Sequence, residues 1–220
     1  MGTERLEYAM ADSPMGPYKQ VGVIMDQSAS KCWTNHQSLV EYQGQWYLFY
    51  HDKDLSPSND AKRSAHADYL TFNEDGTINK VIPTLRGVGI ADAKRHIQID
   101  RYSAISKEGV KVSYLDDAKK NDGWKVELSE KDAFVQYDRV EFGKTALKGV
   151  NVRAMSATGG TLEIRLDKAD GPVVAKVVVP QRSDWAEINA KLTNVPSGQH
   201  NLVVTMPEKK EVAVDWVSFE

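Results

Sequence analysis

Few side chains in this chain have types and spacing that point to chemistry. Asn35 and His36 come directly before a run of apolar and aromatic residues, a position from which they could line a site. His36 could equally hydrogen-bond nearby backbone, so both readings stay open. Cys32 is the single cysteine, so no intrachain disulfide can form. Neither a C-x-x-C nor an H-E-x-x-H spacing occurs, which argues against a zinc site.

Aromatic side chains are a second set of candidates. The chain has 5 tryptophans and 9 tyrosines, and a tryptophan ring can cover the flat apolar face of a sugar at little entropic cost. Alternatively, these residues are ordinary core and edge residues of β-sheets, which also favour them. For Trp185, between a charged turn and a strand, exposure and core packing are equally open.

Composition excludes several classes of function. The net charge of −3 gives no reason to expect nucleic acid or an anionic membrane surface as a partner. Hydrophobic residues make up 41% of the chain, enough for a folded core. The sequence has no apolar run long enough for a transmembrane helix. Its first residues, MGTERLEYAM, lack the apolar region of a signal peptide.

The Asn35-His36 pair is positioned by a predicted hairpin. Residues 38–42 form one short strand, Gln43-Gly44-Gln45 the turn, and residues 46–51 the returning strand. Side chains of the second strand alternate between two faces, and both faces are apolar or aromatic. We therefore expect this strand to be buried between layers. Further strands are predicted at residues 63–72 and 78–82.

The segment NHQSLVEYQGQWYLFYH resembles the last blade of the five-bladed β-propellers of glycoside hydrolase family 43. In that family a histidine precedes a hairpin of the same pattern. The resemblance implies that His36 lines the active site and helps to hold a central metal ion or water network. It also implies that Arg63, in KRSAHADYL, reaches the substrate or the catalytic acid. The alternative for Arg63 is an exposed cation at a strand edge.

Catalysis is a separate question. Glycoside hydrolysis needs at least two positioned carboxyl groups. Family 43 enzymes are inverting and use three, and the resemblance places all three on earlier blades. We therefore expect this chain to be the C-terminal part of a longer enzyme, lacking the N-terminal blades and inactive alone. An enzyme of this kind is expected to be extracellular or periplasmic.

The pattern changes after GVGIADAKR, residues 87–95, which we take as the domain boundary. The predicted domains are residues 1–93, the propeller portion, and residues 94–220, a β-sandwich. In TLEIRLD, Leu162, Ile164 and Leu166 should point inward, with Glu163 and Arg165 on a solvated face. The charged region 107–130 is predicted to form loops. Strands are expected at residues 97–102, 134–142, 149–157, 161–167, 173–180, 185–192, 198–206 and 212–219.

The second half resembles carbohydrate-binding module family 6, a jelly-roll sandwich that commonly follows family 43 domains. The blocks VRAMSATGGTLEIRLD and VAVDWVSFE carry this resemblance. It implies that two loop aromatics grip a sugar, Trp185 being one and Trp124 the best candidate for the other. An asparagine usual in the family is replaced by Ala213. The cleft is therefore weak, altered, or replaced by a second cleft on the sheet face.

The same resemblance implies a structural Ca²⁺ ion. Gln98 and Asp100 alternate along the first strand, and Asp215 lies on the last. Oxygen ligands from both strands, together with carbonyl groups, suit a hard cation. The alternative is that these are ordinary polar residues at strand edges.

Three functions remain open at this point. The first is the C-terminal part of a family 43 glycosidase of the arabinofuranosidase or β-xylosidase type, with xylan or arabinan as partner. The second is a stand-alone carbohydrate-binding β-sandwich without catalysis. The third is an adhesion or scaffold sandwich, which has no need of exposed loop tryptophans such as Trp124 and Trp185.

Overall fold

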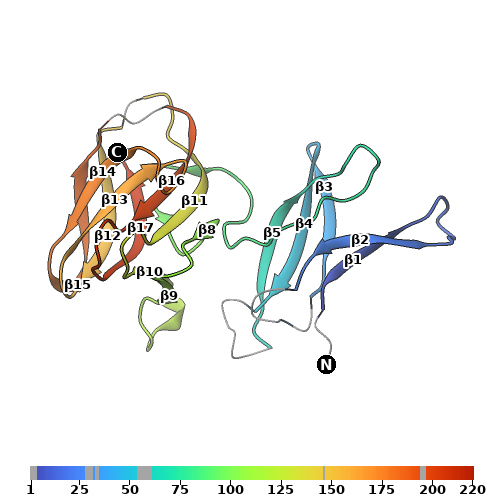
Figure 1. Cartoon of the computed structure of the whole chain (residues 1–220), viewed down its shortest axis with the longest axis horizontal. Helices are drawn as coiled ribbons and strands as arrows, with labels where there is room; N and C mark the ends of the chain where they lie inside the picture. The colour runs from blue at the N-terminus through green and yellow to red at the C-terminus, as the bar shows by residue number, and fades with distance from the viewer. Residues whose placement is uncertain (1–3, 28–31, 33–34, 54–60, 146, 194–196) are drawn as a thin grey trace. The chain divides into compact units, whose positions relative to one another are not determined.

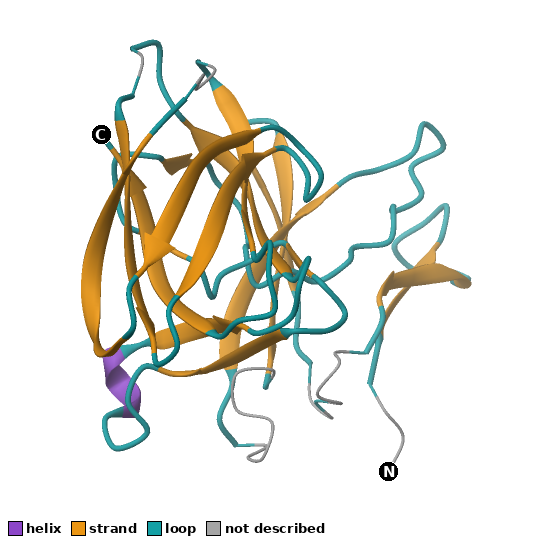
Figure 2. Cartoon of the chain, turned by 60° about the vertical axis from the view of Figure 1, so that its left-hand side comes forward, coloured by secondary structure: helices purple, strands orange, loops and turns teal. Residues whose placement is uncertain are grey.

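The computed structural model describes residues 4–27, 32, 35–53, 61–145, 147–193 and 197–220. The chain divides into two compact units, Met1–Val88 and Gly89–Glu220. No α-helix occurs within the described ranges; a short 3-10 helix, η1 (Lys120–Asp122), is drawn purple in Figure 2. The predicted all-β class is thus confirmed. Among these residues no helix is long and apolar enough to cross a membrane.

The first unit contains a two-stranded and a three-stranded antiparallel sheet (Figure 1). Their strands are β1 (Leu6–Met10), β2 (Lys19–Met25), β3 (Ser38–Tyr42), β4 (Gln45–Asp52) and β5 (Ser64–Leu70). Gln43 and Gly44 both have positive φ, as a two-residue hairpin turn requires. Leu48, Tyr50 and Leu70 pack with Leu6, Ile24, Met25 and Val81 in a small core.

Two predictions about this unit are wrong. Only one face of β4 is covered, because Leu48 and Tyr50 are buried whereas Phe49 on the other face is 46% exposed. Residues 78–82 form no strand. Ile78 and Val81 make single bridges to different segments, Phe72 and Met25, so no continuous ladder can extend between them.

The second unit is a sandwich of two antiparallel sheets. Sheet I has the order β15-β12-β17-β10-β9, with β7 pairing β17, and sheet II the order β14-β13-β16-β11-β6, with β8 pairing β11. Only the short β6–β11 pairing is parallel among the described strands. The strands are β6 (Ala91–Asp92), β7 (Ile97–Gln98), β8 (Ala104–Ile105), β9 (Val110–Tyr114), β10 (Trp124–Leu128), β11 (Phe134–Glu141), β12 (Gly149–Ser156), β13 (Gly160–Leu166), β14 (Val173–Val179), β15 (Arg182–Lys191), β16 (Gln199–Thr205) and β17 (Val212–Phe219).

The sandwich core follows from the two-residue alternation of its strands. Val150, Val152 and Ala154 of β12 are fully buried, and so are Leu162 and Ile164 of β13. The side chains between them point away from the core. The inward set predicted for β13 is therefore confirmed, and the outward side chains of sheet I are left to form a surface for function.

Three details of the sandwich differ from the sequence-based predictions. Residues 107–130 contain β9 and β10, because their charged residues alternate with buried or half-buried valines and leucines. The strand predicted at 97–102 is reduced to Ile97–Gln98. The boundary between the two compact units follows Val88, ahead of the predicted boundary between residues 93 and 94. The residues just after it belong to the sandwich, because β6 pairs with β11 and Ala93 is buried in the sandwich core.

Candidate carbohydrate-binding site

A cavity of about 710 Å³ lies on the outer face of sheet I. Its wall runs from Trp185 on β15 through Arg153 and Met155 on β12 and Lys125 on β10 to Tyr114 on β9. Val152, Ala154 and Val126, which alternate with these residues, belong to the core. The alternation of β12 and β10 therefore sends Arg153, Met155 and Lys125 to the opposite face. Tyr114 lies on the same side of β9 as Val112, which packs on the core, and it reaches the cavity at the end of its strand.

Trp185 is the half-buried aromatic residue at one side of this cavity. The guanidinium carbon of Arg153 lies 5.1 Å from the centre of its ring, within the range of a cation–π contact. Arg153 also donates a hydrogen bond from Nη1 to Oδ2 of Asp215 on β17. The ring is therefore supported from beneath by a cation that is itself held by a carboxylate.

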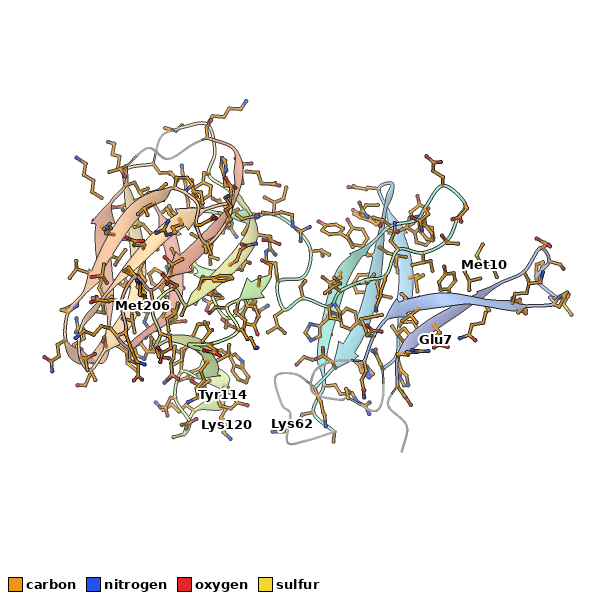
Figure 3. All side chains as sticks on the ribbon, viewed as in Figure 1. Glu7, Met10, Lys62, Tyr114, Lys120 and Met206 are labelled. Atoms are coloured by element: carbon orange, nitrogen blue, oxygen red, sulfur yellow. The ribbon has the colours of Figure 1, made fainter. Side chains whose placement is uncertain are left out.

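Trp124 is not among the described residues that line the cavity. Its ring packs on Tyr114, with 4.1 Å between the ring centres and a tilt of 31°. Lys120 Nζ lies 5.2 Å from the centre of the same tyrosine ring, and Figure 3 shows these two side chains together. Tyr114 is thus a cavity residue that sequence reasoning missed. The alternation of VKVSY could have identified its strand.

The loop between β9 and β10 gives the cavity its charge. Asp116, Asp117 and Asp122 lie along its rim. Lys125 also lines the cavity, but its charge is paired, because its Nζ lies 3.3 Å from Glu127 Oε1. Arg153 is already paired with Asp215. Carboxylates therefore dominate the rim, and they can accept hydrogen bonds from hydroxyl groups.

The residues predicted to hold a cation lie where β7 meets β17. Gln98 pairs with Trp216, and Ile99 N donates to the backbone oxygen of Asp215 at 3.2 Å. Asp100 and Asp215 are only 7% and 3% exposed. Burial raises the pKa of both carboxyl groups, and the charge of Asp215 raises that of Asp100 further.

This environment fits an oxygen-coordinated cation. A divalent ion would favour the charged forms that burial disfavours. Arg153 donates to Oδ2 of Asp215. Within the described residues, no group of three His, Cys, Asp or Glu side chains gathers around one point. Amide and backbone oxygens would therefore have to complete the coordination.

In the first unit, His36 and Arg63 lie near the end of β4 and the start of β5, and both are exposed. The His36 ring meets His51 edge-on, with 5.2 Å between centres. Burial lowers the pKa of His51, and the charges of Arg63 and His36 lower it further. The structure thus brings the two predicted residues into one basic cluster with His51.

Comparison with known proteins identifies the second unit. Residues 103–220 match the sequence model of the carbohydrate binding module (family 6). The chain belongs to carbohydrate-binding module family 6. Its module holds the whole cavity described above, from Tyr114 to Trp185.

Relatives extend beyond the module. The chain is 23% identical to an arabinoxylan arabinofuranohydrolase of Paenibacillus polymyxa over 216 residues, covering 89% of this chain and 32% of that protein. It is 43% identical to a β-xylosidase of Xylanibacter ruminicola over 81 residues, covering 36% of this chain and 24% of the relative. The chain therefore spans about a third of the length of these relatives or less.

A solved structure shows the same fold. The glycoside hydrolase family 43 arabinoxylan arabinofuranohydrolase of Bacillus subtilis, in complex with cellotetraose, superposes with a TM-score of 0.59 at 21% identity. The match covers 98% of this chain and 47% of that one. Taken together, the module match, the relatives and this structure confirm the predicted resemblance to family 43 enzymes and to carbohydrate-binding module family 6.

Proposed function

We propose that the module binds a neutral plant cell-wall polysaccharide of the xylan or arabinan type in the cavity on sheet I. The observation that carries this proposal is Trp185, a partly exposed indole held at the cavity wall by Arg153. A sugar ring stacks on such a face, and the carboxylates of the rim accept its hydroxyl protons. The arabinoxylan-directed names of the relatives support this class of ligand.

The position of the cavity also bears on Ala213. This residue pairs with Met155 on one side and Glu127 on the other, so it lies in the outer surface of sheet I. Its methyl group cannot donate or accept a hydrogen bond. We infer that the sugar is held across the sheet face, with Trp185 and the β9–β10 loop replacing the contact that an asparagine would make.

For the whole protein, we propose a family 43 glycosidase of the arabinofuranosidase or β-xylosidase type, acting outside the cell or in the periplasm. The three-stranded sheet β3-β4-β5 would be its last propeller blade, with His36 and Arg63 facing the substrate. The family's catalytic carboxyl groups belong to earlier blades. The chain alone should therefore bind sugar without cleaving it, which incubation with aryl arabinofuranoside and aryl xyloside would test.

The binding proposal is tested by titration calorimetry with xylotriose and soluble arabinoxylan. Trp185→Ala should lower the affinity about fivefold or more, because the stacking surface is lost. A nucleic-acid base stacked on an aromatic ring is worth about 1–3 kcal/mol, and we expect a sugar face to contribute on the same order. Val178→Ala on sheet II, which also removes an exposed apolar side chain, is the control and should bind normally. Equal affinity of Trp185→Ala and the unmodified chain would reject this site.

A further inference from the structure

We propose that Arg153 is a positioning residue that holds the Trp185 ring in the orientation on which a sugar stacks. The inference rests on the proposed function of the cavity. It concerns a side chain that points at the underside of the indole, not one that must touch the sugar. The guanidinium carbon lies 5.1 Å from the ring centre, and its Nη1 is bonded to Asp215.

Trp185 needs such support because of its place in the sheet. β15 is an edge strand of sheet I and pairs only with β12 within that sheet. The β12–β15 ladder is regular as far as Ala154 opposite Ala186, then shifts before Ser156 opposite Arg182. Trp185 lies in this irregular step and has no partner of its own in the register. Neighbouring ladder pairs therefore do not fix its side-chain rotamer.

Arg153 can supply the missing restraint because it is anchored itself. Asp215 is buried on β17, which lies between β12 and β10 in sheet I. The backbone oxygen of Asp215 also accepts a hydrogen bond from Ile99. A planar guanidinium can bond a carboxylate at its edge while its face lies against an aromatic ring. The edge residue Trp185 is thus tied to a buried residue of the sheet interior.

The consequence is preorganisation. A ring already held in its binding orientation loses less rotamer freedom when the sugar arrives, so more of the stacking energy appears as affinity. A lysine at position 153 keeps a positive charge for Asp215. Its compact ammonium group has no plane, so it cannot hold the carboxylate and cover the indole together. Arg153→Lys therefore separates ring support from the buried ion pair.

The test compares Arg153→Lys with the unmodified chain by xylotriose calorimetry and by the NMR signal of the Trp185 indole N–H. The signal of Trp185 is identified as the one that disappears in Trp185→Phe. We expect Arg153→Lys to bind about threefold to tenfold more weakly, the size of a partly desolvated cation–π contact. The ligand-free indole signal should shift or broaden, while the melting temperature stays nearly unchanged.

The matched control is Arg165→Lys, since Arg165 is also paired with a buried carboxylate, Glu163, but on sheet II. It should leave the affinity and the indole signal unaltered. Wild-type affinity and an unchanged indole signal in Arg153→Lys would overturn the inference. If the unmodified chain bound no xylotriose, the proposed function would fail instead, and the ligand-free indole signal would still decide whether Arg153 positions the ring.

Discussion

Glu163 shows how far a single side chain can depart from its strand pattern. Alternation places it on the outward face of β13, and it does point there, yet it is only 6% exposed. Arg165 Nη2 lies 2.5 Å and Lys176 Nζ 2.9 Å from its two carboxylate oxygens. The sequence shows the direction of the side chain. It does not show that a cation from the neighbouring strand β14 covers it.

This ion-paired carboxylate predicts a pH dependence of stability. Burial opposes the charged form, but hydrogen bonds from Lys176 and Arg165 outweigh it and lower the pKa of Glu163 from 4.5. A lowered folded-state pKa gives stability that is complete above the unfolded value and is lost as the pH falls through the folded value. Glu163→Gln should therefore cost roughly 1–3 kcal/mol at pH 7 and progressively less below pH 4.5.

Urea unfolding at pH 7 and at pH 3 measures this difference. The control is Asp184→Asn, which removes an exposed carboxylate that is also paired with an arginine. It should change the free energy of unfolding by no more than about 0.5 kcal/mol. A deficit of Glu163→Gln that is the same at both pH values would contradict the assignment.

The aspartates of the cavity rim predict a preference among sugars. Asp116, Asp117 and Asp122 should repel a ligand that carries a carboxylate, so glucuronic-acid-substituted xylo-oligosaccharides should bind more weakly than neutral ones. Replacing all three by asparagine should reduce the difference in affinity between neutral and acidic oligosaccharides. Added salt should reduce the same difference in the unmodified chain. Calorimetry with matched neutral and acidic oligosaccharides measures both effects. Asp170→Asn, outside the cavity, is the control and should leave this difference in affinity unchanged.

At the scale of elements, most of the sandwich could be predicted from the period-two pattern. β12 alternates buried and half-buried residues from Val150 to Ser156, because one of its sides faces the core. β17 is instead buried along its whole length. β9 and β10 were missed because lysines and a glutamate occupy their outward positions, which gave a charged region the appearance of loops. The cavity could not be predicted from the sequence. Tyr114 and Trp185 lie far apart in the chain, and only the strand order of sheet I places both of them around it.

The junction of β7 with β17 predicts a response to calcium. We propose that Gln98, Asp100 and Asp215 contribute to a Ca²⁺ site that joins β7 and the residues after it to β17, the last strand of the sandwich. An ion that binds only the folded state raises its stability by mass action. The melting temperature of the sandwich should fall when EDTA is added and recover with excess Ca²⁺.

Asp100→Asn provides the specificity control for that experiment. It removes one proposed ligand without disturbing Arg153, so its melting temperature should respond little to either reagent. An unmodified chain that melts at the same temperature with EDTA and with Ca²⁺ would remove the proposal. The assay should follow the near-ultraviolet signal of Trp216 and Trp124, which lie on the sandwich.

The whole molecule combines two cores of unequal size. The sandwich core draws on both of its sheets, whereas the first unit has a small cluster on one side of β3-β4-β5. The other side of that sheet carries Val40 and Phe49, which are 40% and 46% exposed. A sheet covered on one face only opens more readily, because each opening exposes less apolar surface.

Hydrogen exchange should reveal this difference. Backbone amides of residues 40–50 should exchange faster than those of residues 162–166 in β13, which is flanked by β14 and β16 and packs on the sandwich core. Mass spectrometry of peptic peptides can follow both segments in one sample. Equal protection in a monomer would mean that the first unit is an independently stable domain and that the proposed blade needs no neighbouring blades.

The cavity runs from β15 to β9, the two outermost strands of sheet I. Five strands span four intervals of about 4.8 Å, or roughly 19 Å. A sugar chain that fills this length lies across the strands and touches both rims of the sheet, where fraying begins. A bound sugar chain would therefore contact both edge strands at once. Because these strands open most easily, binding should lower the frequency of their local opening and stabilise sheet I.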